Sequence, residues 1–137
     1  ADLKAKGAAL RGVHARLPDL AAARLPRQRQ ALRDRLQEAL QGAAPISEEV
    51  LAREMAIQVD RLDVGEEITR LGAHLDALDV LLVKDEPIGR QLDFLCQEIG
   101  REINTTGSKS NDVALTAEVL QAKNLLEQMK EQIANVE

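Results

Sequence analysis

Two runs of apolar residues advance in alternating steps of four and three residues, and this spacing restricts the chain to helical folds. The runs are Val64, Ile68, Leu71, Leu75, Leu78 and Leu82, and then Leu115, Val119, Ala122, Leu126, Met129, Ile133 and Val136. Such heptad spacing places every member on one face of an α-helix, where it packs against another helix. No useful length of sequence alternates with a period of two, as a half-buried strand would. The sequence therefore predicts an all-α fold without a sheet, an elongated antiparallel helical bundle with coiled-coil-like helix pairs.

Residues 1–46 are expected to form a basic helical segment of their own. Apolar residues recur at loose helical spacing from Leu3 to Leu40, but Pro18 and Pro26 interrupt the pattern. Each proline removes a backbone donor and crowds the preceding turn, so we expect a kink or break near both. Lys and Arg outnumber Asp and Glu up to residue 40, and the balance reverses afterwards. This asymmetry suits separate surfaces for a polyanion and for cations, although long exposed helices also need charge on their wet faces.

Residues 47–137 are expected to form a helical domain of three further helices. The first should begin near Ser47, followed by two glutamates that suit the start of a helix, and should continue through the first heptad run. The KDEP sequence at 84–87 predicts a stop and restart, with Asp85 as the cap and Pro87 in the first turn.

The next helix should extend to about Thr105 and be followed by a loop at 105–112 (TTGSKSND). There Gly107 would end one helix, and Ser110, Asn111 or Asp112 would cap the next.

Composition excludes several classes of protein. The chain has 137 residues with one Cys, two His and 1% aromatic residues. The single thiol, Cys96, cannot build a disulfide framework, and one thiol with two imidazoles cannot complete a structural zinc finger. A chain with one Phe and neither Trp nor Tyr also cannot stack RNA bases on a platform of rings. No signal peptide or membrane span is evident, so we expect a soluble, cytoplasmic protein with no membrane partner.

Two polar helix faces are candidates for chemistry. One lies opposite the apolar side of the helix that follows residue 87, and it comprises Arg90, Asp93, Phe94, Gln97, Arg101 and Asn104. The other runs beside the first heptad run, and it comprises Asp63, Glu67, Arg70 and His74. Carboxylate and imidazole at such spacing can share a metal ion or relay a proton. The residues alone fit a ladder of surface ion pairs better.

Ser108, Lys109 and Ser110 offer two hydroxyls and an ammonium before a helix N-terminus, a combination that suits a phosphate. Ordinary loops use the same residues, and Lys109 would then pair with an acidic neighbour such as Glu102. His14 lacks a nearby carboxylate in the sequence and is expected at the surface, whereas Cys96 is expected in the core.

Three stretches of the sequence are similar to the C-terminal half of the YicC/YloC family of bacterial endoribonucleases. They are PIGRQLDFLCQEIGREINTTGSKSND at 87–112, DVGEEITRLGAHL at 63–75, and EQMKEQIANVE at the end of the chain. The elements GRxLDFxxQE, RE and NTxxSKS occur in order at the family's spacings. The family's N-terminal domain is missing from this sequence, so the resemblance implies a C-terminal fragment.

The resemblance implies cleavage of RNA phosphodiester bonds by a homo-oligomer, expected to be a hexamer, with a divalent metal ion, Mg or Mn, as cofactor. Matching the family motifs residue by residue gives Glu67, His74, Asp93 and Glu98 as catalytic candidates, the first three also as metal ligands. The RNA-binding candidates are Arg70, Arg90, Gln97, Arg101, Asn104, Ser108, Lys109 and Ser110. Carboxylates that hold a metal beside cationic side chains would neutralise the charge on a phosphate under attack.

Two alternatives stay open. One is a helical module that drives oligomerisation and holds RNA without catalysing a reaction, and the other is a coiled-coil adaptor for a protein partner. Convergence of Glu67, His74, Asp93 and Arg101 in space would favour a catalytic surface. Separate solvent-facing positions would favour the structural module.

Overall fold

The computed structural model describes residues 2–40, 45–84 and 88–136, and within these ranges the chain forms six α-helices and no strand. The helices are α1 (Asp2–Ala23), α2 (Leu25–Ala39), α3 (Glu48–Leu62), α4 (Gly65–Leu82), α5 (Gly89–Ser110) and α6 (Val113–Val136). The all-α prediction is confirmed. None of the helices in these ranges is long and apolar enough to cross a membrane.

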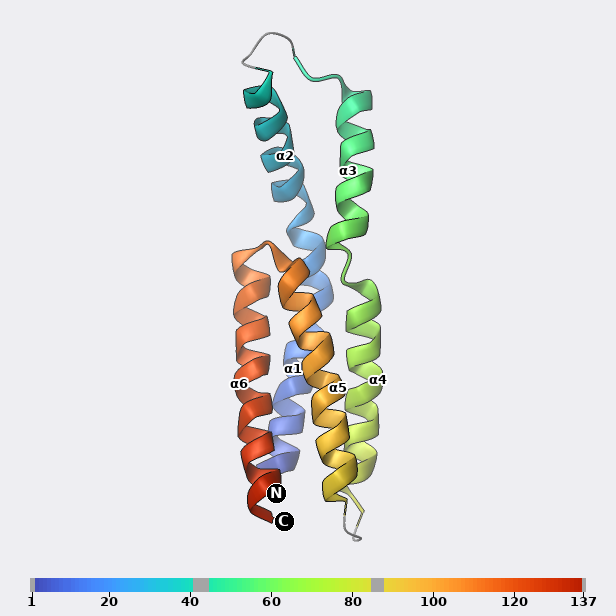
Figure 1. The fold of residues 1–137 in the computed structure, drawn as a ribbon, viewed down its shortest axis with the longest axis vertical. Helices are drawn as coiled ribbons and strands as arrows, with labels where there is room; N and C mark the ends of the chain where they lie inside the picture. Colours follow the sequence, from blue (N-terminus) through green and yellow to red (C-terminus); the bar gives the residue numbers. More distant parts are fainter. Residues whose placement is uncertain (1, 41–44, 85–87, 137) are drawn as a thin grey trace.

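Four helices form an elongated antiparallel body, and the other two extend from one end of it as an arm (Figure 1). In the body each helix packs on two neighbours, α1 on α4 and α6, and α5 on α4 and α6. Helices α1 and α5 run in one direction and α4 and α6 in the other, so the two chain ends lie at the end away from the arm (Figure 1). The arm consists of α2 and α3. The body thus combines α1, from the basic segment, with three helices of the predicted C-terminal domain.

The heptad runs line the core of the body, as their spacing predicts. Leu71, Leu75 and Leu78 of α4 are almost completely buried. The facing surfaces are supplied by α1 (Leu10, Val13, Leu17), by α5 (Leu92, Leu95, Cys96, Ile99, Ile103) and by α6 (Leu115, Val119, Ala122, Leu126, Met129, Ile133). Burying one such side chain stabilises the fold by about 1.5–3 kcal/mol. Cys96 is in the core, as expected.

The single helix predicted from Ser47 through the heptad run is in fact two helices. Ser47 does cap the first, because its hydroxyl accepts a hydrogen bond from the amide of Val50 at 3.1 Å. That helix ends at Leu62, and Asp63 has extended backbone angles. The Asp63 carboxylate accepts a hydrogen bond from the Gly65 amide at 2.8 Å, and this local turn competes with helix continuation. The heptad run therefore begins at the N-terminus of α4, not in the middle of a longer helix.

The two prolines behave differently. Helix α1 continues through Pro18, whereas the helix is interrupted at Arg24 and α2 begins with Pro26 in its first turn. A first-turn proline loses no helical hydrogen bond, which makes this position the tolerated one. The cap and first-turn roles expected of Asp85 and Pro87 lie outside the described residues.

The predicted loop at 105–112 is wrong. Helix α5 continues to Ser110, and the turn is confined to Asn111 and Asp112. Asn111 has a φ of 45° and ends α5, while the Asp112 carboxylate accepts a hydrogen bond from the Leu115 amide at 3.0 Å and caps α6. Gly107 serves packing instead of termination, since a Cβ there would lie 3.1 Å from Cγ1 of Val119.

Candidate functional site

The junction between arm and body is organised around one buried guanidinium. Arg24 is 2% exposed, and its Nη1 donates to the carbonyls of Lys109 and Ser110 at 2.7 Å each. Its Nη2 donates to the Leu62 carbonyl and its Nε to that of Ala21 at 3.1 Å. Desolvation lowers the pKa of Arg24, and nearby Asp112 and Asp63 oppose that shift.

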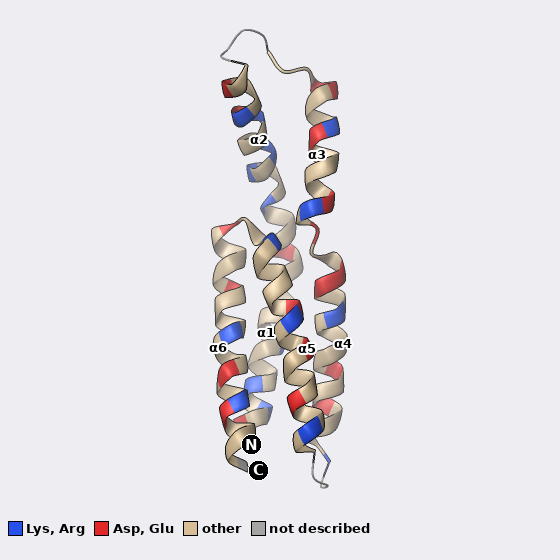
Figure 2. Cartoon of the chain, viewed as in Figure 1, with Lys and Arg blue, Asp and Glu red and all other residues tan. Residues whose placement is uncertain are grey.

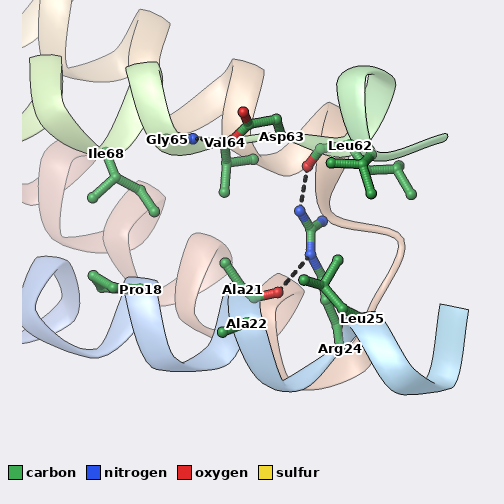
Figure 3. A pocket seen from close by; sticks show the side chains of 11 residues that line it. Pro18, Ala21, Ala22, Arg24, Leu25, Leu62, Asp63, Val64, Gly65 and Ile68 are labelled. Atoms are coloured by element: carbon green, nitrogen blue, oxygen red, sulfur yellow. Dashed lines mark hydrogen bonds between the residues drawn. The ribbon is translucent and has the colours of Figure 1, made fainter. Parts of the chain in front are cut away.

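Arg24 also borders a mainly apolar cavity of about 370 Å³ between α1 and the link from α3 to α4 (Figure 3). Figure 3 shows Pro18 and Ala21 on one side of this cavity and Val64 and Ile68 on the other. Within the cavity wall, the Arg24 guanidinium donates to the carbonyls of Ala21 and Leu62, and the Asp63 carboxylate accepts from the Gly65 amide. Because these polar groups already bind one another, the cavity offers little for a polar substrate.

A second polar contact joins α4 to α5. The Lys109 ammonium donates to the Glu67 carboxylate (Oε2) at 3.0 Å and to the Asp63 carbonyl at 3.2 Å. Glu67 is only 4% exposed, and its other oxygen, Oε1, is buried without a hydrogen-bond partner among the described residues. The prediction of Glu67 as part of an exposed stripe is therefore wrong. Lys109 contacts a protein carboxylate, which is the alternative left open above, with Glu67 in the place suggested for Glu102.

Glu102 instead pairs with Arg70. The Nε of Arg70 lies 3.0 Å from both carboxylate oxygens of Glu102, and its Nη1 donates to Glu66 at 3.2 Å. These hydrogen bonds, with Glu102 first, raise the pKa of Arg70. Glu102 is buried, while about half of the Arg70 side chain is exposed. Arg70 keeps a solvent-facing edge, but its orientation is set by protein carboxylates.

The outward face of α5 carries a continuous exposed row, here called the α5 stripe. It consists of Arg90, Asp93, Phe94, Gln97, Arg101, Asn104 and Ser108. Figure 2 shows Lys, Arg, Asp and Glu residues distributed along α5. The Arg101 side chain is 74% exposed, and its nearest carboxylate, that of Glu98, is 3.8 Å away. The predicted polar face is confirmed, and its cationic and amide groups are open to a ligand.

The proposed metal ligands do not come together. Glu67 contacts Lys109, while Asp93 lies about 24 Å along α5 from Lys109 at ~1.5 Å of rise per residue. Among residues 2–40, 45–84 and 88–136, no three His, Cys, Asp or Glu side chains are placed to share a metal ion. Glu67, His74 and Asp93 are therefore not a metal site in this structure. They face different neighbours because the antiparallel register of α4 and α5 separates them.

The predicted phosphate cluster at 108–110 is also divided. Ser110 is fully buried, and its hydroxyl contacts Thr116 Oγ1 at 2.9 Å and the Asp112 carbonyl at 3.1 Å. A phosphate cannot reach Ser110 without disrupting these contacts. The prediction that Ser110 binds RNA is therefore wrong. Ser108 is exposed, although its hydroxyl bonds back to the Asn104 carbonyl at 3.1 Å.

Sequence reasoning missed the importance of Arg24 and His14. His14 is half-buried, and its Nε2 lies 2.9 Å from the Ile68 carbonyl on α4. A Cβ at Gly72 would lie 3.0 Å from that nitrogen, so the glycine makes room for the imidazole. Gly72 inside a strong heptad helix was the available signal for a close neighbour. Nothing local in the sequence marks Arg24, because its partners other than Ala21 come from two helices that are distant in the sequence, α3 and α5.

The comparisons with known proteins agree with the sequence resemblance. Residues 18–137 match the family described as "Endoribonuclease YicC-like, C-terminal". The chain is 44% identical over 109 residues to a probable endoribonuclease YicC from Clostridioides difficile (strain 630). It is 40% identical over 110 residues to a protein of the same description from Haemophilus influenzae (strain ATCC 51907 / DSM 11121 / KW20 / Rd). Each alignment covers 80% of this chain and 37% of the relative.

Proposed function

Because this chain belongs to the family of YicC-like endoribonucleases, we propose that it provides an RNA-holding surface for cleavage of RNA phosphodiester bonds. The chain spans little more than a third of the curated relatives it matches. The proposal therefore concerns what the residues described above contribute to that reaction.

The observation that carries this proposal is the α5 stripe. Arg101, Asn104 and Gln97 are all exposed on one helix face. Guanidinium and amide groups donate hydrogen bonds to phosphate and sugar oxygens, the contacts that position a nucleic acid without selecting its sequence. Arg90 continues this face toward the start of α5. A backbone lying along α5 could contact several of these groups in succession.

The buried contacts between α4 and α5 support the stripe from behind. Glu67 binds Lys109 and Glu102 binds Arg70, so two ion pairs from one helix to the other fix the rotation of α5. In this proposal Glu67 and Lys109 position the surface. Asp93 and Glu98 stay as acid–base candidates, because Asp93 belongs to the stripe, Glu98 lies beside it, and both keep some exposure. A proton-transferring group must come within ~3 Å of its substrate.

Dependence on a divalent ion, Mg²⁺ or Mn²⁺, is proposed on the family resemblance. The predicted ligand set Glu67, His74 and Asp93 does not fit one ion, so no chemical step is assigned to the ion in this chain. Cleavage by the Clostridioides difficile relative should stop on chelation and return with Mg²⁺ or Mn²⁺. This chain, assayed in parallel, should bind RNA and leave it uncut. Metal-independent cleavage by the relative, or cleavage by this chain alone, would contradict the respective part of the proposal.

RNA binding is tested with two arginine variants. Arg101→Gln should weaken binding of single-stranded RNA and lower the slope of log affinity against log salt by about 0.7, the loss of one phosphate contact. Arg53→Gln is the matched control, because Arg53 is also an exposed helical arginine about one turn from a carboxylate. Equal effects of the two variants would mean that the stripe makes no specific phosphate contact.

We also propose a cytoplasmic homo-oligomer, with the hexamer as the expected assembly. Val80 and Phe94, each 59% exposed, help to line an apolar groove of about 550 Å³ between α4 and α5. Exposed apolar surface of this kind is common at protein contacts. Phe94→Glu should lower the mass measured by light scattering. The control is Leu120→Glu on α6, which is similarly exposed but lies outside the groove and should leave the mass unchanged. A monomeric parent chain would contradict self-association through this groove.

A further inference from the structure

The first half of α5 carries a charge pattern that is complementary to itself. Phe94 is the only Phe of a chain that has neither Trp nor Tyr, and it is 59% exposed. Arg90 lies four residues before Phe94 and Glu98 four residues after it, so a cation, a ring and a carboxylate follow one another along one helix face.

The two charges of this pattern are not neutralised within the chain. Arg90 is exposed and has no hydrogen bond or ion pair with any residue that the structure describes. Glu98 is 28% exposed, and the Arg101 guanidinium beside it is 3.8 Å away, which is too long for a hydrogen bond. Both groups are therefore available to an opposite charge from another molecule.

Two copies of α5 satisfy this pattern when they run antiparallel. An antiparallel pair that crosses at Phe94 places Arg90 of each copy beside Glu98 of the other, because both residues lie four positions from the crossing point. A parallel pair would bring Arg90 next to Arg90 and Glu98 next to Glu98, and like charges across a contact are unfavourable. An antiparallel pair of identical helices has two-fold symmetry, the commonest symmetry of homo-oligomers.

The apolar groove between α4 and α5 lies beside the same three residues. Val80 and Phe94 line it, and Arg90 is the only charged residue among the described residues of its lining. Val80 is as exposed as Phe94. In a two-fold contact the Phe94 ring of each copy covers the groove of the other, so apolar burial favours association while the ion pairs select the orientation.

We propose that two copies of this chain pair through α5 in an antiparallel, two-fold contact centred on Phe94, and that this contact joins their α5 stripes into one RNA-binding surface. The inference rests on the self-association and RNA binding proposed above. It adds the orientation of the contact and the consequence of that orientation for RNA.

The contact covers only the first half of the α5 stripe. Because α5 begins at Gly89, five residues before Phe94, the paired helices overlap no further than Ile99. Arg101 and Asn104 lie beyond this overlap and stay open on both copies. The Arg101 residues of the two copies are about 21 Å apart along the helix direction, at ~1.5 Å of rise per residue. An RNA strand that reaches both therefore contacts two open half-stripes at once.

The contact also divides the roles of the residues along α5. Arg90 and Glu98 hold the two copies together, which leaves Asp93 as the acid–base candidate and Arg101 as the main phosphate contact. The start of α5 lies at the end of the body away from the arm (Figure 1), so the arms of the two copies point in opposite directions. A two-fold contact closes at two copies, so a hexamer needs a second contact elsewhere on the chain.

An exchange of the two charges tests the orientation. Arg90→Glu places two carboxylates together, and Glu98→Arg places two guanidinium groups together, so each should raise the dissociation constant of the dimer by about tenfold or more. The double variant restores both ion pairs in reversed order and should return the constant to that of the parent. Analytical ultracentrifugation measures the constant, and circular dichroism verifies that each variant keeps its helicity.

The charge exchange has two contrary outcomes. A parent chain that associates while the double variant stays dissociated would overturn the antiparallel contact and leave self-association in place. A parent chain that is monomeric at every concentration would overturn both.

The joint RNA surface is tested with Phe94→Ala, which changes no charge. When RNA binds two half-stripes, the second contact is intramolecular, so Phe94→Ala should weaken binding of a strand that reaches both by about tenfold or more. Binding of a strand too short to reach both should be unchanged. Leu120→Ala on α6 is the matched control, because Leu120 is 58% exposed and lies outside the groove. Equal losses for long and short strands would overturn the joint surface.

Arg101→Gln separates this inference from the proposed function. It should weaken binding of long and short strands alike and leave the dissociation constant of the dimer unchanged, because Arg101 lies beyond the overlap. If Arg101→Gln binds RNA as the parent does, the α5 stripe fails as an RNA surface. If only the charge exchange fails, the stripe stands and the contact between copies does not.

Discussion

The body and the arm are both helical, yet they are held together by different means. The body buries one continuous cluster that includes Leu10, Leu75, Ile99 and Met129. In the arm only Leu32 and Leu51 are buried apolar residues among those described, and both lie outside that cluster. The arm instead has ion pairs across its two helices, from Arg29 and Arg33 to Glu48. Exposed ion pairs contribute little to stability, so heptad packing gives the body a much larger share of the folding free energy than the arm.

The largest expected effect comes from a cavity in the body compared with one in the arm. Leu75→Ala should lower the free energy of unfolding by about 2–5 kcal/mol, because the surrounding helices cannot close the space. Leu51→Ala should lower it by less than half as much, since the arm can open without unfolding the body. Urea denaturation gives the first quantity, and hydrogen exchange resolved by residue locates the second. Equal losses would show that arm and body unfold as one unit.

A smaller effect is expected at the polar contact between α4 and α5. Glu67→Gln should destabilise the chain by about 1–3 kcal/mol, since Lys109 would lose its carboxylate partner in a buried setting. Sequence reasoning, which placed Glu67 at the surface, predicts almost no change in melting temperature. The neighbouring Glu66 is the control, because its side chain is 83% exposed and Glu66→Gln should alter stability little. Thermal melts that move equally for both variants would contradict the buried assignment.

The smallest effect is a pH dependence at the turn where arm and body meet. The hydrogen bond from the Leu115 amide, followed by that from Arg27, holds the pKa of Asp112 below its usual value. A depressed pKa in the folded state means that Asp112 stabilises the fold above the unfolded pKa of about 3.9, and that this contribution is lost as pH falls through the folded pKa. When the free energy of unfolding is measured from neutral pH down to pH 2, it should fall less steeply with pH in Asp112→Asn than in the parent. Parallel curves would remove Asp112 from this role.

Sequence patterns predict the body better than the details of its polar residues. Leu71 and Leu126 are buried because helical periodicity is a local property, and it needs no knowledge of partners. Gly107 misled the prediction of a loop, since its missing side chain accommodates Val119 of another helix. Such a contact depends on how α5 meets α6, which no local pattern encodes.

In the candidate site, too, local helical geometry could be predicted from the sequence, whereas contacts between helices could not. The exposed face with Arg101 and Asn104 follows from helical geometry, and the family motifs identify the region. The partners of Glu67 and Arg70 could not be predicted, because they depend on the register between α4 and α5. That register also separates Glu67 from Asp93, and the predicted metal site fails for this reason.

The position of Arg24 has a consequence for helix electrostatics. Its guanidinium meets carbonyls from the last turns of three helices, Ala21 of α1, Leu62 of α3, and Lys109 and Ser110 of α5. The carboxyl end of a helix carries a partial negative charge from its aligned peptide dipoles, so three such ends would repel one another without a cation between them. A lysine would keep the charge but not the planar fork of donors that reaches all three ends, and Arg24→Lys would therefore not be a conservative exchange.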